Sequence, residues 1–495
     1  MTTIAPTATA TPARHWIAGE WAPSGAVAES IDPSTGDVIG SYYAGGAAEA
    51  KAAITAARAA FDTTEWSRDA RLRARALHEL ADRLAARAES LAAMLSRENG
   101  KLLWETGWEV ATAADWLRYS AATALTQNAG QAAEVAPGAY FHSAPQPMGV
   151  AGIITPWNSP IILTARAIGP ALAAGCTVVI KMPGQTALTN ALFAEVIAEA
   201  ASLPAGVVNA FTEIGNEGAP LMVESPDVDV ISYTGSTLVG RKIAEVGGRS
   251  LKRLNLELGG KTPLIVFDDA DVDAALPVLI RAATMMNGQF CATGSRVLVQ
   301  RSIADTVRER LAAALAAVEV GPADDPNSQL GPLVDAAAAT RVDQLVEAAL
   351  SYATPVVRGG LITEGPLAVS GAFYRPSLLE VDELDVALVQ AETFGPVQSF
   401  EIFDDEADAI RRANATEYGL AAAIFTANAG RARRVGRAVD AATVWINTWG
   451  LLHEGFEQGG FKQSGNGYLC GPRAIEQFQE LKVYAEAAAP SPENG

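Results

Sequence analysis

The chain has 495 residues, too many for a single hydrophobic core, and 49% of them are hydrophobic, enough to fill two or three cores. Its formal net charge of -19 at pH 7 argues against a nucleic-acid-binding protein, because such a chain would not neutralise a phosphate backbone. Three cysteines are too few and too odd for a disulfide scaffold, so we expect a cytoplasmic protein in a reducing compartment.

Targeting signals and metal sites are not expected. Residues 1–14 are rich in Thr, Ala and Pro without a basic segment followed by an apolar one, which predicts a disordered tail and not a signal peptide. No stretch of 18 apolar residues is free of charges or breakers, so no membrane span is expected. The four histidines form no zinc-binding spacing: His15, His78, His142 and His453.

The first part of the chain predicts a short strand with a turn and then helices. Residues 16–21 have strand character. Residues 47–61 are Ala-rich and helical, and leucines recur near helical spacing through residues 68–97, with Gly100 as a plausible stop. A further helix is expected over residues 104–125.

Residues 132–148 change character, with Gly, Pro and aromatic residues in alternation. This pattern predicts an extended hairpin. Because a hairpin isolated between α/β units often serves assembly, we expect the protein to form oligomers.

From Gly149 onwards, strand-like segments alternate with segments of helical periodicity. Such alternation predicts an α/β fold with a parallel, doubly wound sheet. A second α/β unit begins near residue 262 and its pattern repeats to about Trp445. The strands expected in the first unit are 150–154, 177–180, 206–211 and 228–233, and its helices are 162–174 and 189–201.

A carboxylate and a thiol each lie in a short glycine-containing segment. Glu257 precedes Gly259 and Gly260, and Cys291 follows 34 positions later (291 minus 257). A nucleophilic thiol needs a partner that makes it a thiolate, and a covalent thioester needs a base to deliver water; Glu257 could do both. On these two residues alone, a surface glutamate and a small buried cysteine would be the commoner arrangement.

A candidate phosphate site follows the strand-like residues 231–234. The Gly235-Ser236 turn leads into a helix, whose free N–H groups and dipole would face an anion. Lys181 ends the strand 177–180, and ligands of open α/β sheets bind at such strand ends. An ordinary strand–helix turn and a solvated lysine are the alternative interpretations.

Six co-linear segments together resemble the aldehyde dehydrogenase superfamily, and the resemblance covers roughly residues 15 to 487. The six segments are 155–160 (TPWNSP), 235–237 (GST), 256–261 (LELGGK), 288–291 (GQFC), 392–397 (ETFGPV) and 459–465 (GGFKQSG).

The resemblance implies the aldehyde dehydrogenase fold: a Rossmann-like cofactor domain, an α/β catalytic domain and a small β oligomerisation element. It implies a homodimer or homotetramer whose assembly strands include residues 481–485. The implied ranges are 15–130 and 150–258 for NAD(P) binding, 131–149 and 478–488 for assembly, and 259–477 for catalysis.

The resemblance also implies the chemistry, which is the oxidation of an aldehyde to an acid through a covalent thiohemiacetal and thioester. Cys291 matches the nucleophile, Asn158 the donor to the oxyanion and Glu257 the base that activates the deacylating water. The cofactor would be NAD or NADP. Its expected contacts are Thr155, Pro156, Trp157, Lys181, Gly184, Gly215, Gly235, Ser236, Leu258, Glu392 and Phe394.

The expected substrate is a small-molecule aldehyde, with a semialdehyde or an aryl aldehyde as the candidate classes. Arg166 could clamp a substrate carboxylate, or form a structural salt bridge with an acidic neighbour. The remaining residues expected at the entrance are Phe290, Leu452, His453 and Gln458.

The chain departs from the family pattern at several positions. Relatives that prefer NAD usually carry Glu where this chain has Gly184, and losing that carboxylate removes a repulsion against a 2′-phosphate, so we predict that NADP is accepted. Ala167 replaces a common Lys, and Tyr468-Leu469 replaces a common Arg-Glu, so the usual proton path around the base is not expected here. Met286 stands at a position that is usually Asn.

The sequence argues against two other functions. A CoA-acylating semialdehyde dehydrogenase typically lacks the general-base glutamate, whereas Glu257 is present. A non-catalytic relative that keeps the fold would not need Cys291, Asn158 and Glu257 together.

Overall fold

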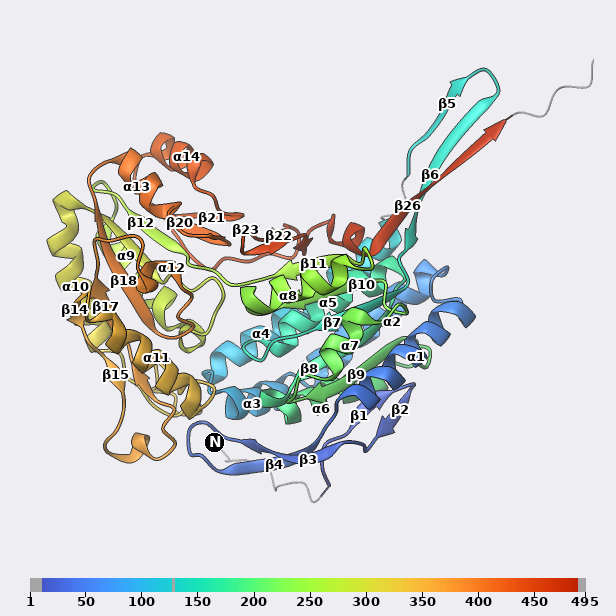
Figure 1. Cartoon of the computed structure of the whole chain (residues 1–495), viewed down its shortest axis with the longest axis horizontal. Coiled ribbons are helices and arrows are strands. Elements are labelled where there is room, and N and C mark those ends of the chain that lie inside the picture. Colours follow the sequence, from blue (N-terminus) through green and yellow to red (C-terminus); the bar gives the residue numbers. More distant parts are fainter. Residues whose placement is uncertain (1–10, 127–129, 488–495) are drawn as a thin grey trace, which may run out of the picture.

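The computed structural model describes residues 11–126 and 130–487. The apolar strands expected from Gly149 onwards pair into an eight-stranded sheet, which β1, β2, β11 and β24 complete (Figure 1). The order is β2-β1-β9-β8-β7-β10-β11-β24, and the five strands from β9 to β11 are parallel. The strands are β1 (His15–Ile17), β2 (Glu20–Ala22), β7 (Val150–Ile154), β8 (Thr177–Pro183), β9 (Val208–Glu213), β10 (Val230–Thr234), β11 (Arg253–Glu257) and β24 (Gly465–Asn466).

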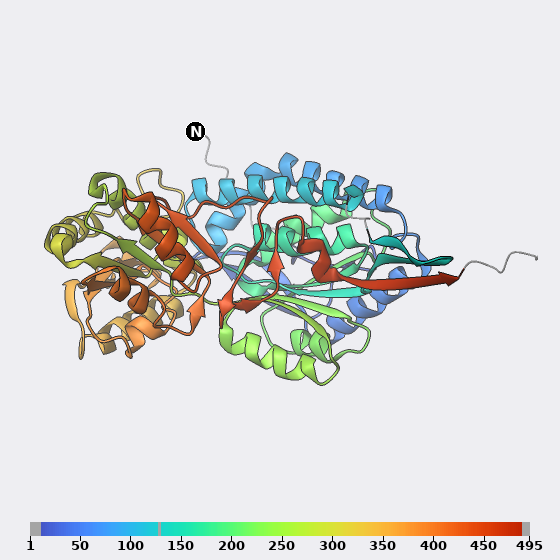
Figure 2. The same ribbon diagram turned by 90° about the horizontal axis from the view of Figure 1, so that it is seen from above.

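Helices cover both faces of this sheet, which explains the nearly continuous apolar runs of its central strands (Figure 2). One face packs against α2 (Ala70–Ala86), α3 (Ala88–Asn99), α4 (Leu103–Thr126), α5 (Pro160–Ala174) and α6 (Ala187–Ala198). The other face packs against α1 (Ala47–Thr63), α7 (Gly218–Glu224) and α8 (Thr237–Gly248).

A seven-stranded sheet forms the second unit, in the order β14-β17-β18-β13-β12-β20-β21. Only β14 is antiparallel to its neighbour within this described sheet. The strands are β12 (Pro263–Val266), β13 (Arg296–Gln300), β14 (Thr354–Val357), β17 (Ser377–Glu380), β18 (Val397–Phe403), β20 (Ala421–Phe425) and β21 (Thr443–Ile446), and the helices are α9 (Val272–Thr284), α10 (Ala304–Ala316), α11 (Ala336–Ala349), α12 (Ala387–Gln390), α13 (Glu406–Ala413) and α14 (Ala429–Ala438).

A three-stranded arm projects from the first unit (Figure 1). The predicted hairpin is β5 (Ala132–Ala136) and β6 (Ala139–Pro147), and β26 (Gln479–Ala487) pairs with β6 in antiparallel register. Large apolar side chains are exposed on this arm: Val135, Tyr140, Phe141, Leu481, Val483 and Tyr484.

Two predicted segments are confirmed as helix and strand, but their bounds differ in the structure. The helical segment expected over residues 68–97 is broken into α2 and α3 at Arg87, whose guanidinium pairs with Glu195 at 2.9 Å and also with Glu199. The strand expected over residues 177–180 continues as β8 to Pro183, because its last residues pair with β9. Lys181 therefore lies within the strand and does not follow it.

The two units face each other where β11 ends and the second sheet begins. Glu257 is the last residue of β11, and the chain starts β12 at Pro263 after a short glycine-containing crossing. Cys291 lies a few residues before β13, which pairs with β12. The carboxyl edge of the first sheet thus meets the amino edge of the second, with the carboxylate and the thiol at the junction.

Candidate active site

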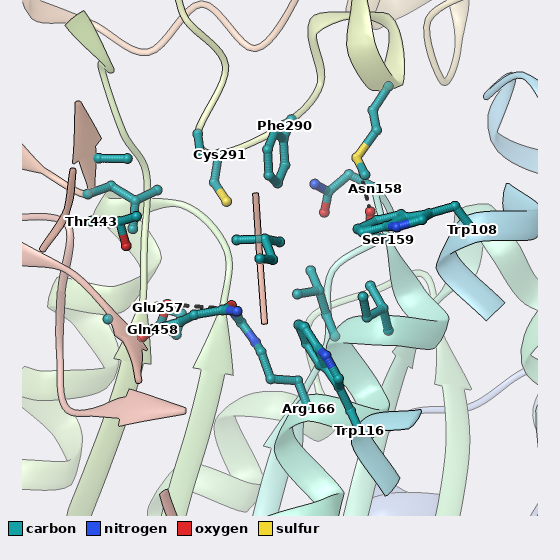
Figure 3. A pocket seen from close by; sticks show the side chains of 18 of the residues that line it. Trp108, Trp116, Asn158, Ser159, Arg166, Glu257, Phe290, Cys291, Thr443 and Gln458 are labelled. Atoms are coloured by element: carbon teal, nitrogen blue, oxygen red, sulfur yellow. Dashed lines mark hydrogen bonds and ion pairs between the residues drawn. The ribbon is translucent and has the colours of Figure 1, made fainter. Parts of the chain in front are cut away.

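Two cavities meet at the thiol. One has a volume of about 660 Å³ and the other of about 810 Å³. Both are lined by Asn158, Leu163, Glu257 and Cys291. Figure 3 shows the Cys291 side chain pointing into the first cavity, with Asn158 beside it and Glu257 on the opposite wall. The three residues expected to be catalytic are therefore brought together.

The thiol loop is held in place by buried hydrogen bonds. Met286 and Asn287 have φ values of 52° and 58°, in the left-handed region that non-glycine residues rarely adopt. Glu105 accepts the Met286 N–H at 2.6 Å, and Asn287 binds the backbone at Gly100, Gly331 and Pro332. These contacts offset the backbone strain and fix the segment that leads to Cys291.

Asn158 lies in the loop between β7 and α5. Its Nδ2 donates to the Gln289 carbonyl at 3.0 Å, which leaves the second N–H of the amide for another acceptor. Glu109 of α4 accepts the N–H groups of Ile161 and Ile162 at the start of α5 and pairs with the buried Lys101. The loop therefore ends at a capped helix, which positions Asn158 beside the thiol loop.

Glu257 is buried at the end of β11. Burial raises its pKa to about 7, although the nearby Arg166 guanidinium acts in the opposite direction. Arg166 Nη1 lies 3.7 Å from Glu257 Oε2, and Oε1 accepts no hydrogen bond from any residue of the described chain. A carboxylate with this pKa can accept and release a proton near neutral pH.

Cys291 carries a thiol, not a thiolate, in this environment. Burial raises its pKa to about 12; Arg166 lowers it, while the carboxylates Glu392 and Glu257 raise it further. The thiol must therefore lose its proton to a base when it reacts. Glu257 lines the same two cavities and has a suitable pKa.

The larger cavity is lined by most of the residues expected to bind cofactor. Gly235 and Ser236 lie at the N-terminus of α8, where Ser236 Oγ accepts the Val239 N–H at 3.4 Å. Phe394 has a φ of 53° and meets Trp157 edge-to-face, with ring centroids 5.5 Å apart. The expected residues that line this cavity are Pro156, Trp157, Gly235, Ser236, Leu258, Glu392 and Phe394.

Close backbone approaches explain the glycine pair after Glu257. A Cβ on Gly259 would lie 2.6 Å from Glu392 Oε2, and one on Gly260 would lie 2.4 Å from the Cys291 carbonyl oxygen. Glu392 also accepts the Gly260 N–H at 3.2 Å, and burial raises the pKa of this carboxyl to about 7. Any side chain at Gly260 would push the base strand away from the thiol loop.

Four residues expected to bind cofactor lie outside both cavities: Thr155, Lys181, Gly184 and Gly215. The Thr155 hydroxyl donates a hydrogen bond to the Lys181 carbonyl. Burial lowers the pKa of the Lys181 ammonium, and the nearby Glu213 carboxylate acts in the opposite direction. Gly184 is buried, and a Cβ there would lie 2.6 Å from Ile214 Cγ1. Gly215 is exposed.

The smaller cavity contains four of the five expected substrate residues: Arg166, Phe290, Leu452 and Gln458. His453 does not line it. Its side chain is 64% exposed, its Nδ1 accepts the Gly455 N–H at 2.9 Å, and its ring packs against Phe456. The local turn directs His453 towards solvent, next to a leucine that faces inward.

Sequence reasoning missed much of the aromatic wall. Trp108 and Trp116 of α4 and Trp445 of β21 line the smaller cavity, together with Met286, whose sulfur accepts the Ser159 hydroxyl. The eight-residue spacing of Trp108 and Trp116 places them on one helix face and was the available signal. In the larger cavity, Thr234, Gly259 and Arg341 were missed.

Metal-ligand clusters of three or more His, Cys, Asp or Glu residues are absent from the part of the chain that the structure describes. Within the same part, no helix combines the length and apolar character that crossing a membrane requires.

Comparisons with known proteins agree with this geometry. Residues 21–484 match the model of the aldehyde dehydrogenase family. The chain is 37% identical to the 2-hydroxymuconic semialdehyde dehydrogenase of Pseudomonas putida over 479 residues, 95% of this chain and 98% of that protein. It is 34% identical to the (Z)-2-((N-methylformamido)methylene)-5-hydroxybutyrolactone dehydrogenase of Acinetobacter baylyi over 470 residues, 94% of this chain and 95% of that protein.

A solved structure shows the same fold. The betaine aldehyde dehydrogenase of Staphylococcus aureus in complex with NAD+ superposes with a TM-score of 0.94 at 32% identity, covering 98% of this chain and 97% of that one. With the thiol, amide and carboxylate converging between two cavities, these matches show that the chain belongs to the aldehyde dehydrogenase family.

Proposed function

We propose that this protein is a hydrolytic, NAD(P)-dependent aldehyde dehydrogenase that acts on a semialdehyde, with an aryl aldehyde as the second candidate substrate. The observation that carries the proposal is the meeting of two cavities at Cys291, Asn158 and Glu257. One cavity would hold the aldehyde and the other the reactive end of the cofactor. Residues 15–130 and 150–258 would form the cofactor domain and residues 259–477 the catalytic domain.

The larger cavity fits a dinucleotide. Its wall includes the N-terminus of α8, where free N–H groups favour a pyrophosphate, and Glu392, which could bind ribose hydroxyls. A further cavity of about 1260 Å³, with the mainly apolar residues Leu238, Val239 and Ile243 in its wall, would suit an adenine ring. When bound, the nicotinamide accepts the hydride that leaves the substrate carbon.

The proposed reaction begins at Cys291. Glu257 takes up the thiol proton, and the sulfur forms a bond to the aldehyde carbon to give a thiohemiacetal. The second N–H of the Asn158 amide and the backbone N–H of Cys291 donate to the oxygen, and each such donor is typically worth about 3 kcal/mol in acyl chemistry. Loss of hydride converts the thiohemiacetal into a thioester on Cys291.

Deacylation uses the same carboxylate. Glu257, once deprotonated, removes a proton from water as the water attacks the thioester carbonyl, and the C–S bond breaks to release the acid and the thiol. The balance is aldehyde plus NAD(P)+ plus water giving acid, NAD(P)H and a proton.

The substrate class is proposed from the smaller cavity. Arg166 is a buried cation in a wall otherwise rich in Trp108, Trp116 and Phe290, so the cavity can bind a chain or ring that carries a carboxylate. The relative from Pseudomonas putida, whose name gives 2-hydroxymuconic semialdehyde as its substrate, supports this class. Glu257 in the cavity wall argues against CoA acylation and against a non-catalytic role.

We expect Cys291→Ala to abolish aldehyde-dependent NAD(P)H formation, by at least about 10⁴-fold, because the covalent path is lost. Cofactor binding should survive, as judged by quenching of tryptophan fluorescence on titration with NAD+. Cys176→Ala is the control, because it removes a buried thiol that lines neither of the two cavities. Activity that persists in the Cys291 variant would show that the covalent mechanism is wrong.

NADP should be accepted, with kcat/KM within about tenfold of the value for NAD. The physical reason is the absence of a free carboxylate near Lys181: position 184 is glycine, and the oxygens of Glu213 accept the N–H groups of residues 217–219 at the start of α7. Steady-state kinetics with both cofactors at saturating aldehyde measure this ratio. A preference for NAD of several hundredfold would refute the prediction.

The assembly is proposed to be a homodimer or homotetramer built through the arm. Its exposed apolar side chains need cover, and β26 presents Leu481 and Val483, 71% and 63% exposed, on one face. A cytoplasmic location is likewise a proposal, supported by the free state of Cys176, Cys291 and Cys470.

Replacing Leu481 and Val483 together by Asp should convert the oligomer into smaller species, because charges would be buried in the interface. Light scattering coupled to size-exclusion chromatography measures the mass. Lys482→Glu, on the opposite face of β26, is the matched control and should leave the mass unchanged. A wild-type protein that is monomeric at 10 µM concentrations, or a double variant of unchanged mass, would contradict the proposed interface.

A further inference from the structure

Arg166 and the candidate base Glu257 line the same cavity, and the Arg166 guanidinium points towards Glu257 and Gln458 (Figure 3). It is 8% exposed and projects from α5, whereas Glu257 is 4% exposed at the end of β11. The two side chains form an ion pair of 3.7 Å between Nη1 and Oε2. Two opposite charges are thus buried together at the point where the reaction is proposed to occur.

The guanidinium is oriented by neutral side chains. Its Nη1 donates to Gln458 Oε1 at 3.2 Å, and its Nη2 lies 3.4 Å from Thr234 Oγ1. Nε of Arg166 and Oε1 of Glu257 are buried without a hydrogen-bond partner among the described residues. The pair therefore has one free donor and one free acceptor, which suits a site that handles both a substrate and a water.

Among residues 11–126 and 130–487, no second cation pairs with Glu257. Cys291 faces it across the cavity, and Cys470 lies close enough for the Glu257 charge to raise the pKa of its thiol. The Glu392 carboxylate, which lines the proposed cofactor cavity, also raises the pKa of the Cys291 thiol. Arg166 also lines a neighbouring cavity of about 310 Å³, together with Tyr119, Glu454 and Cys470.

The residues that replace the usual partners of the base point elsewhere. Ala167 carries no charge and is buried. The Tyr468 hydroxyl donates a hydrogen bond to Glu476, and the Arg473 Cζ atom lies 5.0 Å from the centroid of the Tyr468 ring. Leu469 is buried in the core. Arg166 is consequently the cation within salt-bridge distance of Glu257 in the described chain.

We propose that Arg166 is a positioning residue for the general base: it holds Glu257 at the cavity wall and stabilises the ionised carboxylate that deacylation requires. This role rests on the proposed function of Glu257 and is separate from any contact between Arg166 and a substrate carboxylate. A carboxylated substrate and the base would then share one guanidinium, because Arg166 lines the cavity while its Nη1 pairs with Glu257.

The test is the pH dependence of deacylation in Arg166→Gln, with a neutral aldehyde such as propanal so that substrate charge plays no part. Without the cation, the pKa of Glu257 should rise above about 7, since the stabilising charge on the ionised form is gone. The acid limb of kcat should move to higher pH by about one unit or more, which is about tenfold lower kcat on that limb. Activity should recover at pH 9.

Pre-steady-state kinetics show which step has changed. Because Glu257 both takes up the thiol proton and activates the deacylating water, Arg166→Gln at pH 6.5 should slow the burst of NAD(P)H as well as the steady-state rate, and both should recover at pH 9. Arg166→Lys, which keeps the charge, should restore the wild-type limb to within about half a pH unit. With a carboxylated aldehyde, Arg166→Gln should in addition raise KM.

Arg434→Gln is the matched control, since it removes a surface Arg–Glu pair (2.7 Å to Glu406) far from the cavity and should leave the profile unchanged. A profile of Arg166→Gln that overlays the wild type, or a loss of kcat that is equal at every pH, would overturn the proposal. If Arg166→Gln does not fold, an Arg166→Lys profile shifted by a unit or more would also overturn it. Failure of the wild type to form NAD(P)H would instead refute the proposed function.

Discussion

The close approach of the Gly259-Gly260 backbone to the thiol loop is the constraint on which the site depends. A Cβ at Gly260 would lie 2.4 Å from the carbonyl oxygen of Cys291, so the strand that ends in Glu257 and the loop that carries the thiol touch through backbone. One side of this contact belongs to the first sheet and the other to the second. The catalytic geometry is therefore a property of how the two units meet, and neither sheet alone contains it.

Burial at this contact sets the charges of the site. It raises the pKa of Glu257 and of Glu392 to about 7, lowers that of Lys261 to about 7 and raises that of Cys291 to about 12. A buried thiol is inert until a base takes its proton, and a buried carboxylate near neutrality can act as that base. The Arg166 cation favours the ionised forms of both groups, which gives this one side chain an effect on each half of the reaction.

Much of the fold could be predicted from sequence, because alternating strands and helices and the turn residues between them are local patterns. The hairpin at 132–148 and the strand–turn–helix at Gly235 are examples that the structure confirms. The break at Arg87 could not be predicted, because leucines continue near helical spacing on both sides of it; the pairs of Arg87 with Glu195 and Glu199 join segments far apart in the chain.

In the site, too, residues that stand in motifs could be predicted, whereas contacts between distant segments could not. Cys291, Glu257 and Asn158 stand in recognisable segments, and the structure brings them to one junction. The Arg166–Glu257 pair joins residues on different elements, and sequence left a clamp and a salt bridge as alternatives. The structure shows a 3.7 Å ion pair, and the clamp on a substrate carboxylate stays a prediction. His453 was expected at the entrance, but a local turn sends it to solvent, which no spacing in the chain reveals.

The most direct measurement is the intact mass of the Glu257→Gln variant after prolonged mixing with an aldehyde and NAD+ at pH 9, where solvent hydroxide can take up the thiol proton that Glu257 no longer accepts. The account predicts that Cys291 keeps the acyl group, so the protein gains the mass of the acyl residue, peptide mapping places it on Cys291, and one NADH forms per site. Multiple turnovers without an adduct, or an acyl group on another residue, would contradict the claim that this thiol and this carboxylate divide the reaction between them.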